Sequence, residues 1–357
     1  MRVVIVGAGI LGAALARAVA AQGAEVCVLD QAGVASGASG QSFGWVNASF
    51  YADAAHFALR AEGIEAYRRL CRDLSLPVRF SGALCWEESG AALAQQAADL
   101  EALGYDAEIV GADDLAWMEP TVAGVEEAVF FRQEAAVEAG ALTPGLLSDA
   151  GVQVMSGCAV EAIEVSDGRV SGVRVAGGVL PADRVIVTAG VGSAALLAPL
   201  GVDLPMLHRP GVIFTTAPVA PVLNHVCVAP IGEFRQLPDG RILMPTAVAH
   251  QADASDHVAD RLDVLAEAAC ARLQAVLPDV ALRWQDVALA LRPVPGDGLP
   301  AIGLCGPEGL FSAVMHSGIT LAPVVAEILG AAVMDQAHDK ADLIAPYTLA
   351  RFQRDVS

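Results

Sequence analysis

The sequence predicts an α/β protein with two interleaved domains, one built on a mostly parallel sheet and one on a mostly antiparallel sheet. A strand, a glycine-rich turn, a helix and a second strand open the chain, and another strand–helix pair closes it. Between them lie strands separated by proline and glycine, which are typical of antiparallel hairpins. A length of 357 residues also exceeds what one small domain needs.

The first element pattern is a βαβ unit. Residues 2–6 are β-branched and uninterrupted, as expected of a buried parallel strand. An alanine-rich helix is predicted over 10–22, and a second strand over 25–29 leads into Asp30. The unit therefore predicts a parallel sheet at the start of the chain.

The remaining elements follow from local periodicity and turn signals. Residues 33–44 are small and polar but too embedded to be a linker. Helices are predicted over 52–74, 90–103, 256–276 and 319–334. Strands are predicted over 78–86, 152–155, 158–165, 169–175, 184–188 and 310–315, and antiparallel strands over 207–246, with a hairpin turn at 238–240.

Composition excludes several functions. The net charge of −20 argues against nucleic-acid binding through phosphate neutralisation and against docking on anionic lipid through basic residues. Seven scattered cysteines without a C-x-x-C pair predict no disulfide framework and no metal site, and free thiols indicate a reducing, cytoplasmic location. No transmembrane segment is predicted. A mean hydropathy of +0.51 leaves peripheral contact with the inner face of a membrane open.

The most informative motif is the glycine pattern after the first strand. Gly7 allows the tight turn, Gly9 lets a pyrophosphate approach the backbone, and Gly12 lets helix and strand pack closely. The amides at the start of the helix can bind a phosphate group. Asp30, at the end of the second strand, can accept hydrogen bonds from a ribose. These features predict a dinucleotide site without separating NAD from FAD.

Three further motifs add to this site. The buried strand ending in Ala189-Gly190 lets a ligand pass close to the backbone. Arg292 precedes a turn rich in proline and glycine, where its guanidinium can hold a carboxylate through two hydrogen bonds. His316 and Gly318 lie where a strand turns into a helix, whose first turn favours partial negative charge.

In this order and spacing, the four motifs resemble the D-amino-acid oxidase/glycine oxidase (DAO) superfamily of FAD-dependent oxidoreductases. The glycine pattern and segments 38–44, 185–190, 291–303 and 316–330 carry the resemblance, which extends over essentially the whole chain. The helix around 143–150 is short for this family. It implies a Rossmann-like FAD-binding domain with an interleaved substrate domain on a mostly antiparallel sheet. The predicted FAD-binding domain comprises 1–77, 138–206 and 293–357, and the substrate domain comprises 78–137 and 207–292.

The resemblance also implies roles for individual residues. The expected cofactor-binding residues are Gly7, Gly9, Ile10, Leu11, Gly12, Asp30, Gln31, Ala38, Ser39, Gln41, Ser42, Phe43, Val160, Ala189, Gly190, Gly318, Ile319 and Thr320. Arg292 and His316 are the catalytic candidates, and Arg292 and Arg235 are the substrate-binding candidates. Ser42 and Phe43 stand where some members carry a linking histidine, and Arg292 stands near where others carry a linking cysteine, so non-covalent FAD is implied.

The implied reaction is oxidation of an amino acid or related amine to the imine, followed by hydrolysis to an oxo acid. The substrate class covers D-amino acids, glycine, and N-substituted or cyclic amino acids. The alternatives are a 2-hydroxy-acid dehydrogenase on the same scaffold and a non-catalytic flavoprotein subunit of a larger complex. The electron acceptor is oxygen, a quinone or a partner protein. The only lysine, Lys340, lies far from every motif and favours a dehydrogenase.

Overall fold

A computed structural model describes residues 1–248 and 253–353. Its central element is a six-stranded sheet of order β21-β22-β13-β1-β2-β9. All neighbours in it are parallel except β21, which runs antiparallel to β22. The strands are β1 (Arg2–Val6), β2 (Glu25–Asp30), β9 (Gln153–Ser156), β13 (Arg184–Val187), β21 (Ala301–Leu304) and β22 (Leu310–Val314).

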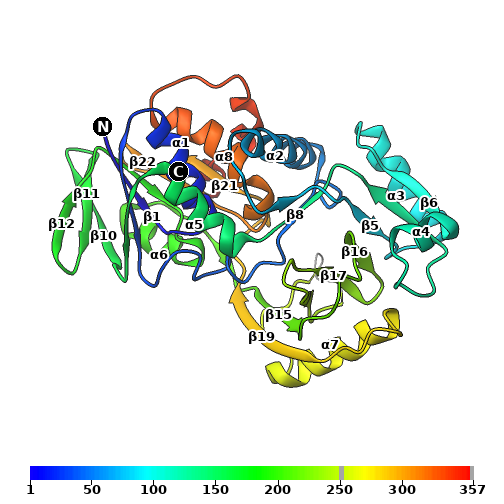
Figure 1. Cartoon of the computed structure of the whole chain (residues 1–357). Helices are drawn as coiled ribbons and strands as arrows, with labels where there is room; N and C mark the ends of the chain where they lie inside the picture. The colour runs from blue at the N-terminus through cyan, green and yellow to red at the C-terminus, as the bar shows by residue number, and fades with distance from the viewer. Residues whose placement is uncertain (249–252, 354–357) are drawn as a thin grey trace.

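The two faces of this sheet are covered differently. Val3 and Ile5 of β1 join a core with helices on one face, whereas Val4 and Val6 join a core with a second sheet on the other. The helices are α1 (Ile10–Ala21), α2 (Ala54–Asp73), α5 (Ala139–Ala150) and α8 (Gly318–Val333). The covering sheet is β10 (Val160–Ser166), β11 (Arg169–Val175) and β12 (Gly178–Pro181), seen at the left of Figure 1. Strict alternation along β1 therefore builds a three-layer unit.

The second large sheet has eight strands in the order β19-β15-β18-β17-β16-β5-β7-β6. Its pairs are antiparallel except β16 with β5. The strands are β5 (Ala83–Cys85), β6 (Glu108–Gly111), β7 (Glu127–Phe131), β15 (Pro210–Thr216), β16 (Val226–Ala229), β17 (Gly232–Gln236), β18 (Ile242–Pro245) and β19 (Trp284–Leu291). The predicted hairpin at 238–240 connects β17 to β18.

Helices also cover this second sheet. Helix α7 (Leu262–Val276) buries Ala266, Ala269, Cys270 and Leu273 in one core with residues of β15, β17 and β18. This spacing is one apolar stripe of a helix. Figure 1 shows α7 below β15 and β19, with α3 (Gly90–Ala102), α4 (Ala112–Met118) and β6 at the far end of the molecule. Helix α6 (Ser193–Leu197) follows β13. A small sheet consists of β3 (Trp45–Val46), β8 (Ala135–Val137) and β4 (Val78–Arg79). Strand β14 (Met206–Leu207) pairs with β20 (Val294–Pro295).

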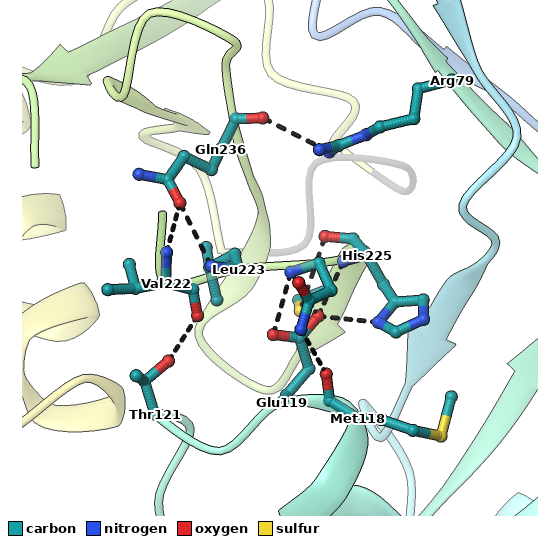
Figure 2. A network of polar contacts seen from close by, with 10 residues as sticks. Arg79, Met118, Glu119, Thr121, Val222, Leu223, His225 and Gln236 are labelled. Carbon is teal, nitrogen blue, oxygen red and sulfur yellow. Dashed lines mark hydrogen bonds and ion pairs between the residues drawn. The ribbon is translucent and has the colours of Figure 1, made fainter. Parts of the chain in front are cut away.

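A buried polar network fixes the loop before β16 (Figure 2). The Glu119 carboxylate, which is 2% exposed, accepts hydrogen bonds from the backbone amides of Asn224 and His225. The Nδ1 atom of His225 lies 2.8 Å from Glu119 Oε1. In the same region, Gln236 Oε1 accepts from the amides of Val222 and Leu223. These contacts satisfy backbone groups that strand pairing leaves unpaired, and they join α4 to the eight-stranded sheet.

The α/β prediction is confirmed, but three element predictions need correction. The strand expected over 78–86 divides into β4 and β5 in different sheets, because Gly82 adopts a positive φ of 81°. The helix expected over 256–276 begins only at Leu262, since the Asp256 carbonyl contacts His208 instead of a helical amide. The helix expected around 143–150 begins earlier, at Ala139. Pro144 lies inside it, and the Gly140 carbonyl that loses its usual partner belongs to an exposed residue.

Candidate active site

A cavity of about 810 Å³ lies at the carboxyl ends of the parallel strands, between the two large sheets. Open α/β sheets bind ligands at this edge. All the predicted site residues except Gly12 and Arg235 line it. The cavity also contacts Arg60, Asn47 and Trp45, and residues of β15, β18 and β19 from the second sheet. The structure thus gathers four separate sequence motifs around one space.

The glycine turn is built as the fingerprint requires. Gly7 has a φ of 110°, and a Cβ there would lie 2.5 Å from the carbonyl oxygen of Thr188. A Cβ on Gly12 would lie 1.9 Å from the Gly7 carbonyl oxygen, so Gly12 serves helix packing rather than the cavity wall. The Thr188 hydroxyl donates to the Gly7 carbonyl at 3.0 Å and ties the end of β13 to this turn. Both close approaches exclude any larger residue.

Two helices point their N-termini at this cavity. Neither α1 nor α8 has an acidic residue in its first turn, and in neither helix does the side chain of the N-cap residue accept from an amide of the helix. The amide of Ile10 donates to Ser39 Oγ at 2.9 Å, which places the loop of residues 31–44 across the start of α1. Helix N-termini without acidic residues stabilise anionic groups through their dipole and their remaining amides. The arrangement fits the pyrophosphate of a dinucleotide at α1.

Asp30 is held firmly at the end of β2. Its Oδ2 accepts from the Ala8 amide at 2.8 Å, and its Oδ1 accepts from the Ala32 and Gly33 amides at 2.9 Å each. The carboxylate therefore links the glycine turn to the loop after β2 while still lining the cavity. Gln31, Cys158 and Val160 line the same cavity. These residues suit an adenosine with a free ribose hydroxyl.

Arg292 follows β19 and is 9% exposed. Its aliphatic part crosses Gly211, where a Cβ would lie 3.4 Å from Arg292 Cγ and Cδ. Its Nη2 donates to the Asp253 carbonyl at 3.0 Å and to Asp253 Oδ2 at 3.1 Å. Burial lowers the pKa of Arg292, and the neighbouring Asp253 opposes this effect. No sequence pattern pointed to Asp253, because 38 intervening positions separate it from Arg292 and only the fold brings the two together.

Arg235 is not brought into the cavity. It is 2% exposed, and its donors contact the Phe43 carbonyl at 2.5 Å, Glu138 Oε1 at 2.6 Å and the Val137 carbonyl at 3.1 Å. It therefore joins β17 to the loop before β3 and to the start of α5, which is a structural role. His316 is half-buried at the cavity wall, where its predicted role remains a prediction.

Arg60 is a charged cavity residue that sequence analysis missed. It is 5% exposed and lies on α2 among the buried residues Phe57, Ile64 and Tyr67. Positions 57, 60, 64 and 67 follow helical spacing, so a charged residue in an apolar stripe was the available signal. Burial lowers the pKa of Arg60 to about 10, which leaves the side chain charged at neutral pH.

Comparisons with known proteins agree with this geometry. The sequence profile of a family described as FAD dependent oxidoreductase (DAO) matches residues 2–332. A glycine oxidase of Pseudomonas putida is 30% identical over 195 residues, which are 52% of this chain and 51% of that protein. The matched region thus spans about half of that relative. D-amino acid dehydrogenase 2 of Ralstonia nicotianae is 30% identical over 317 residues, 81% of this chain and 72% of that protein.

A solved structure shows the same fold. The glycine oxidase of Geobacillus kaustophilus superposes with a TM-score of 0.86 at 22% identity, covering 98% of this chain and 99% of that one. In the parts of the chain that the structure describes, no helix is long and apolar enough to cross a membrane.

Proposed function

The chain belongs to the family of FAD-dependent oxidoreductases, and we propose that it oxidises the Cα–N bond of a small amino acid or N-substituted amino acid. The observation that carries this proposal is the buried guanidinium of Arg292 in the same cavity as the glycine turn. A carboxylate and an adjacent amine are what such a cation can recognise and position.

The sheet order supports a placement for the two halves of FAD. The strands β2 and β22 are separated by β1 and β13, about 14 Å at the usual strand spacing. With the pyrophosphate at α1, the adenosine extends toward Asp30 after β2. The other half then extends past β13 toward α8, which follows β22, and this is the half of the cavity we assign to the flavin ring.

The residues of this chain would bind, orient and shield the substrate. Bound FAD supplies the hydride-accepting chemistry. Arg292 holds the carboxylate and so fixes the direction of the Cα–H bond. Gly211, Pro245 and Leu289, from three strands of the second sheet, cover the reacting region and exclude water. The open first turn of α8 favours negative charge at its end of the cavity.

The same cavity supports an expectation about the electron acceptor. Lys340 Nζ contacts Glu62 Oε1 at 2.5 Å on α2, and the cavity lining contains no lysine among the residues that the structure describes. We therefore favour transfer to a quinone or a partner protein over direct reaction with oxygen. Oxygen consumption compared with reduction of a soluble quinone analogue distinguishes the two acceptors.

A spectrum and a substrate panel test the proposal. We expect the purified protein to absorb as oxidised flavin and to release FAD on acid precipitation, because no covalent anchor is expected. Under anaerobic conditions, glycine, sarcosine, proline or a D-amino acid should bleach the flavin band. Bleaching by 2-hydroxy acids alone would contradict amine oxidation, and a holoprotein that no member of either panel reduces would indicate a non-catalytic subunit.

A further inference from the structure

Three residues of α2 face the first turn of α8, one helical turn apart. Arg60 Nη1 donates to Ser317 Oγ at 2.5 Å, and the Tyr67 hydroxyl donates to the Ile319 carbonyl at 2.7 Å. Between them, Gly63 comes so close to α8 that a Cβ would lie 2.6 Å from the Thr320 carbonyl oxygen. The missing side chain at position 63 is what lets Arg60 reach the end of α8.

The Arg60 guanidinium joins this helix end to the strand–loop segment that begins with β3. Its Nε donates to the Asn47 carbonyl at 3.1 Å and its Nη2 to Asn47 Oδ1 at 2.5 Å. The Asn47 amide in turn donates to Thr320 Oγ1 at 3.2 Å. Arg60, Asn47, Ser317 and Thr320 all line the cavity. The cation is therefore part of the wall and is fixed by three acceptors.

This contact changes what the end of α8 offers to a ligand. Ser317 is the N-cap residue, a position where a serine oxygen usually accepts from an amide of its own helix. Here it makes no such bond and accepts from Arg60 instead. The first-turn amides of α8 stay open, and a buried positive charge lies beside them.

We infer that Arg60 is a positioning residue that raises the reduction potential of the bound flavin, through its own charge and through the open helix end that it maintains. The inference rests on the proposed location of the flavin ring beside α8. Two-electron reduction adds negative charge to the ring system, so a fixed, desolvated cation nearby stabilises the reduced state more than the oxidised state.

The test is the midpoint potential of the holoenzyme, measured with a chemical reductant and a reference dye. Arg60→Gln should lower the equilibrium constant for two-electron reduction at least tenfold, a fall of about 30 mV. Arg60→Lys keeps the positive charge, so its equilibrium constant for two-electron reduction should stay within about threefold of the parent's value. An Arg60→Gln holoenzyme with the parent's potential would overturn the inference.

Arg69 offers a matched control. It lies on the same helix and also joins α2 to α8, through Glu327 at 2.6 Å, but it is 32% exposed and outside the cavity lining. Arg69→Gln should therefore leave the equilibrium constant for two-electron reduction within about twofold of the parent's value. A fall equal to that of Arg60→Gln would assign the effect to helix docking and overturn the role of the buried charge.

Two further measurements cover weak or unstable variants. If Arg60→Gln loses FAD on purification, the ratio of dissociation constants for oxidised and reduced FAD gives the same quantity, and it should fall at least tenfold. If Arg60→Gln does not fold, Arg60→Lys is the deciding variant. A tenfold or larger fall in its equilibrium constant for two-electron reduction, despite the retained charge, would overturn the inference. None of these measurements needs a substrate, so the inference about Arg60 can be tested even if no member of the substrate panel reduces the flavin.

Discussion

Arg292 joins the two parts of the molecule through one side chain. It extends from the second sheet, crosses Gly211 and contacts Asp253 while lining the cavity next to the parallel sheet. Because the guanidinium is nearly buried, a substrate carboxylate bound to it would also be desolvated. The strength of this interaction then depends on the charges that already surround Arg292.

Replacing Arg292 with alanine tests the carboxylate contact. Leaving a desolvated carboxylate unpaired costs roughly 2–5 kcal/mol, so Arg292→Ala should lower kcat/KM on the order of 30- to several-thousand-fold. Flavin content should change little, because we expect the glycine turn and α1 to hold the cofactor. The measurement is kcat/KM per bound flavin, on a substrate with and without its carboxylate. Arg209 lies next to Arg292 but outside the cavity lining, so Arg209→Ala should leave kcat/KM within about threefold of the parent's value.

Asp253 partly neutralises the same guanidinium. In Asp253→Asn the negative charge is gone, so a substrate carboxylate should bind more tightly and KM should fall about three- to tenfold, or roughly 0.6–1.4 kcal/mol. A decarboxylated substrate should show no such change. A rise in KM would mean instead that Asp253 orients Arg292 for binding.

At the scale of elements, the contact between α2 and α8 positions the helix end that faces the cavity. Gly63 makes this contact possible, and Arg60 and Tyr67 secure it on either side. Helix propensity alone disfavours a glycine inside α2. Its presence in the middle of a 20-residue helix therefore reflects packing rather than local preference.

Gly63→Ala should separate the two helices. The added methyl group would meet the Thr320 carbonyl at 2.6 Å, and overpacking of this kind costs about 1–3 kcal/mol of unfolding free energy. Gly140 on α5 is the matched control, because a Cβ there meets nothing within 4 Å. Gly140→Ala should be neutral or stabilising by up to about 1 kcal/mol. Equal denaturation midpoints for the two variants would contradict the packing argument.

At the scale of the whole molecule, Glu134 holds together segments far apart in the sequence. Its Oε1 accepts from the Tyr105 hydroxyl at 2.8 Å and from the Ser49 amide at 3.1 Å, and its Oε2 accepts from Trp45 Nε1 at 2.9 Å. The side chain is fully buried. Burial raises the pKa of Glu134 from 4.5 to about 7, and the hydrogen bonds to the carboxylate oppose this rise.

This shift predicts a pH dependence with a definite sign. Between pH 4.5 and 7 the folded protein binds the Glu134 proton more tightly than the unfolded chain does. The resulting stabilisation is complete below pH 4.5 and is lost as the pH rises through 7. Its size is on the order of 3 kcal/mol. The free energy of unfolding of the parent minus that of Glu134→Gln, measured by urea denaturation at a series of pH values, should therefore fall by about 3 kcal/mol as the pH rises from 4.5 through 7.

A second buried group makes the comparison between variants necessary. Burial lowers the pKa of His56 to about 4, which gives a contribution of opposite slope as its imidazole titrates in the unfolded chain. That contribution is present in both proteins and cancels in the difference. Parallel stability curves for the parent and Glu134→Gln would contradict the raised pKa of Glu134.

The β1–α1–β2 unit, the glycine turn and the family could all be predicted from sequence alone. Each depends on contiguous residues whose backbone requirements are local, such as the positive φ at Gly7 and the close packing at Gly12. The motifs around Arg292 and His316 were recognisable for the same reason, and the structure places them beside one cavity. The division of the chain into an FAD-binding and a substrate domain stays a prediction.

Which charged side chains face the cavity could not be predicted without the fold. Arg235 and Arg60 are both buried arginines, yet one binds backbone carbonyls and Glu138 away from the cavity, and the other forms part of its wall. The partners of each lie as far as 192 and 257 positions away in the chain. A buried charge is stable only where the fold brings its acceptors together, and no local pattern encodes such distant neighbours.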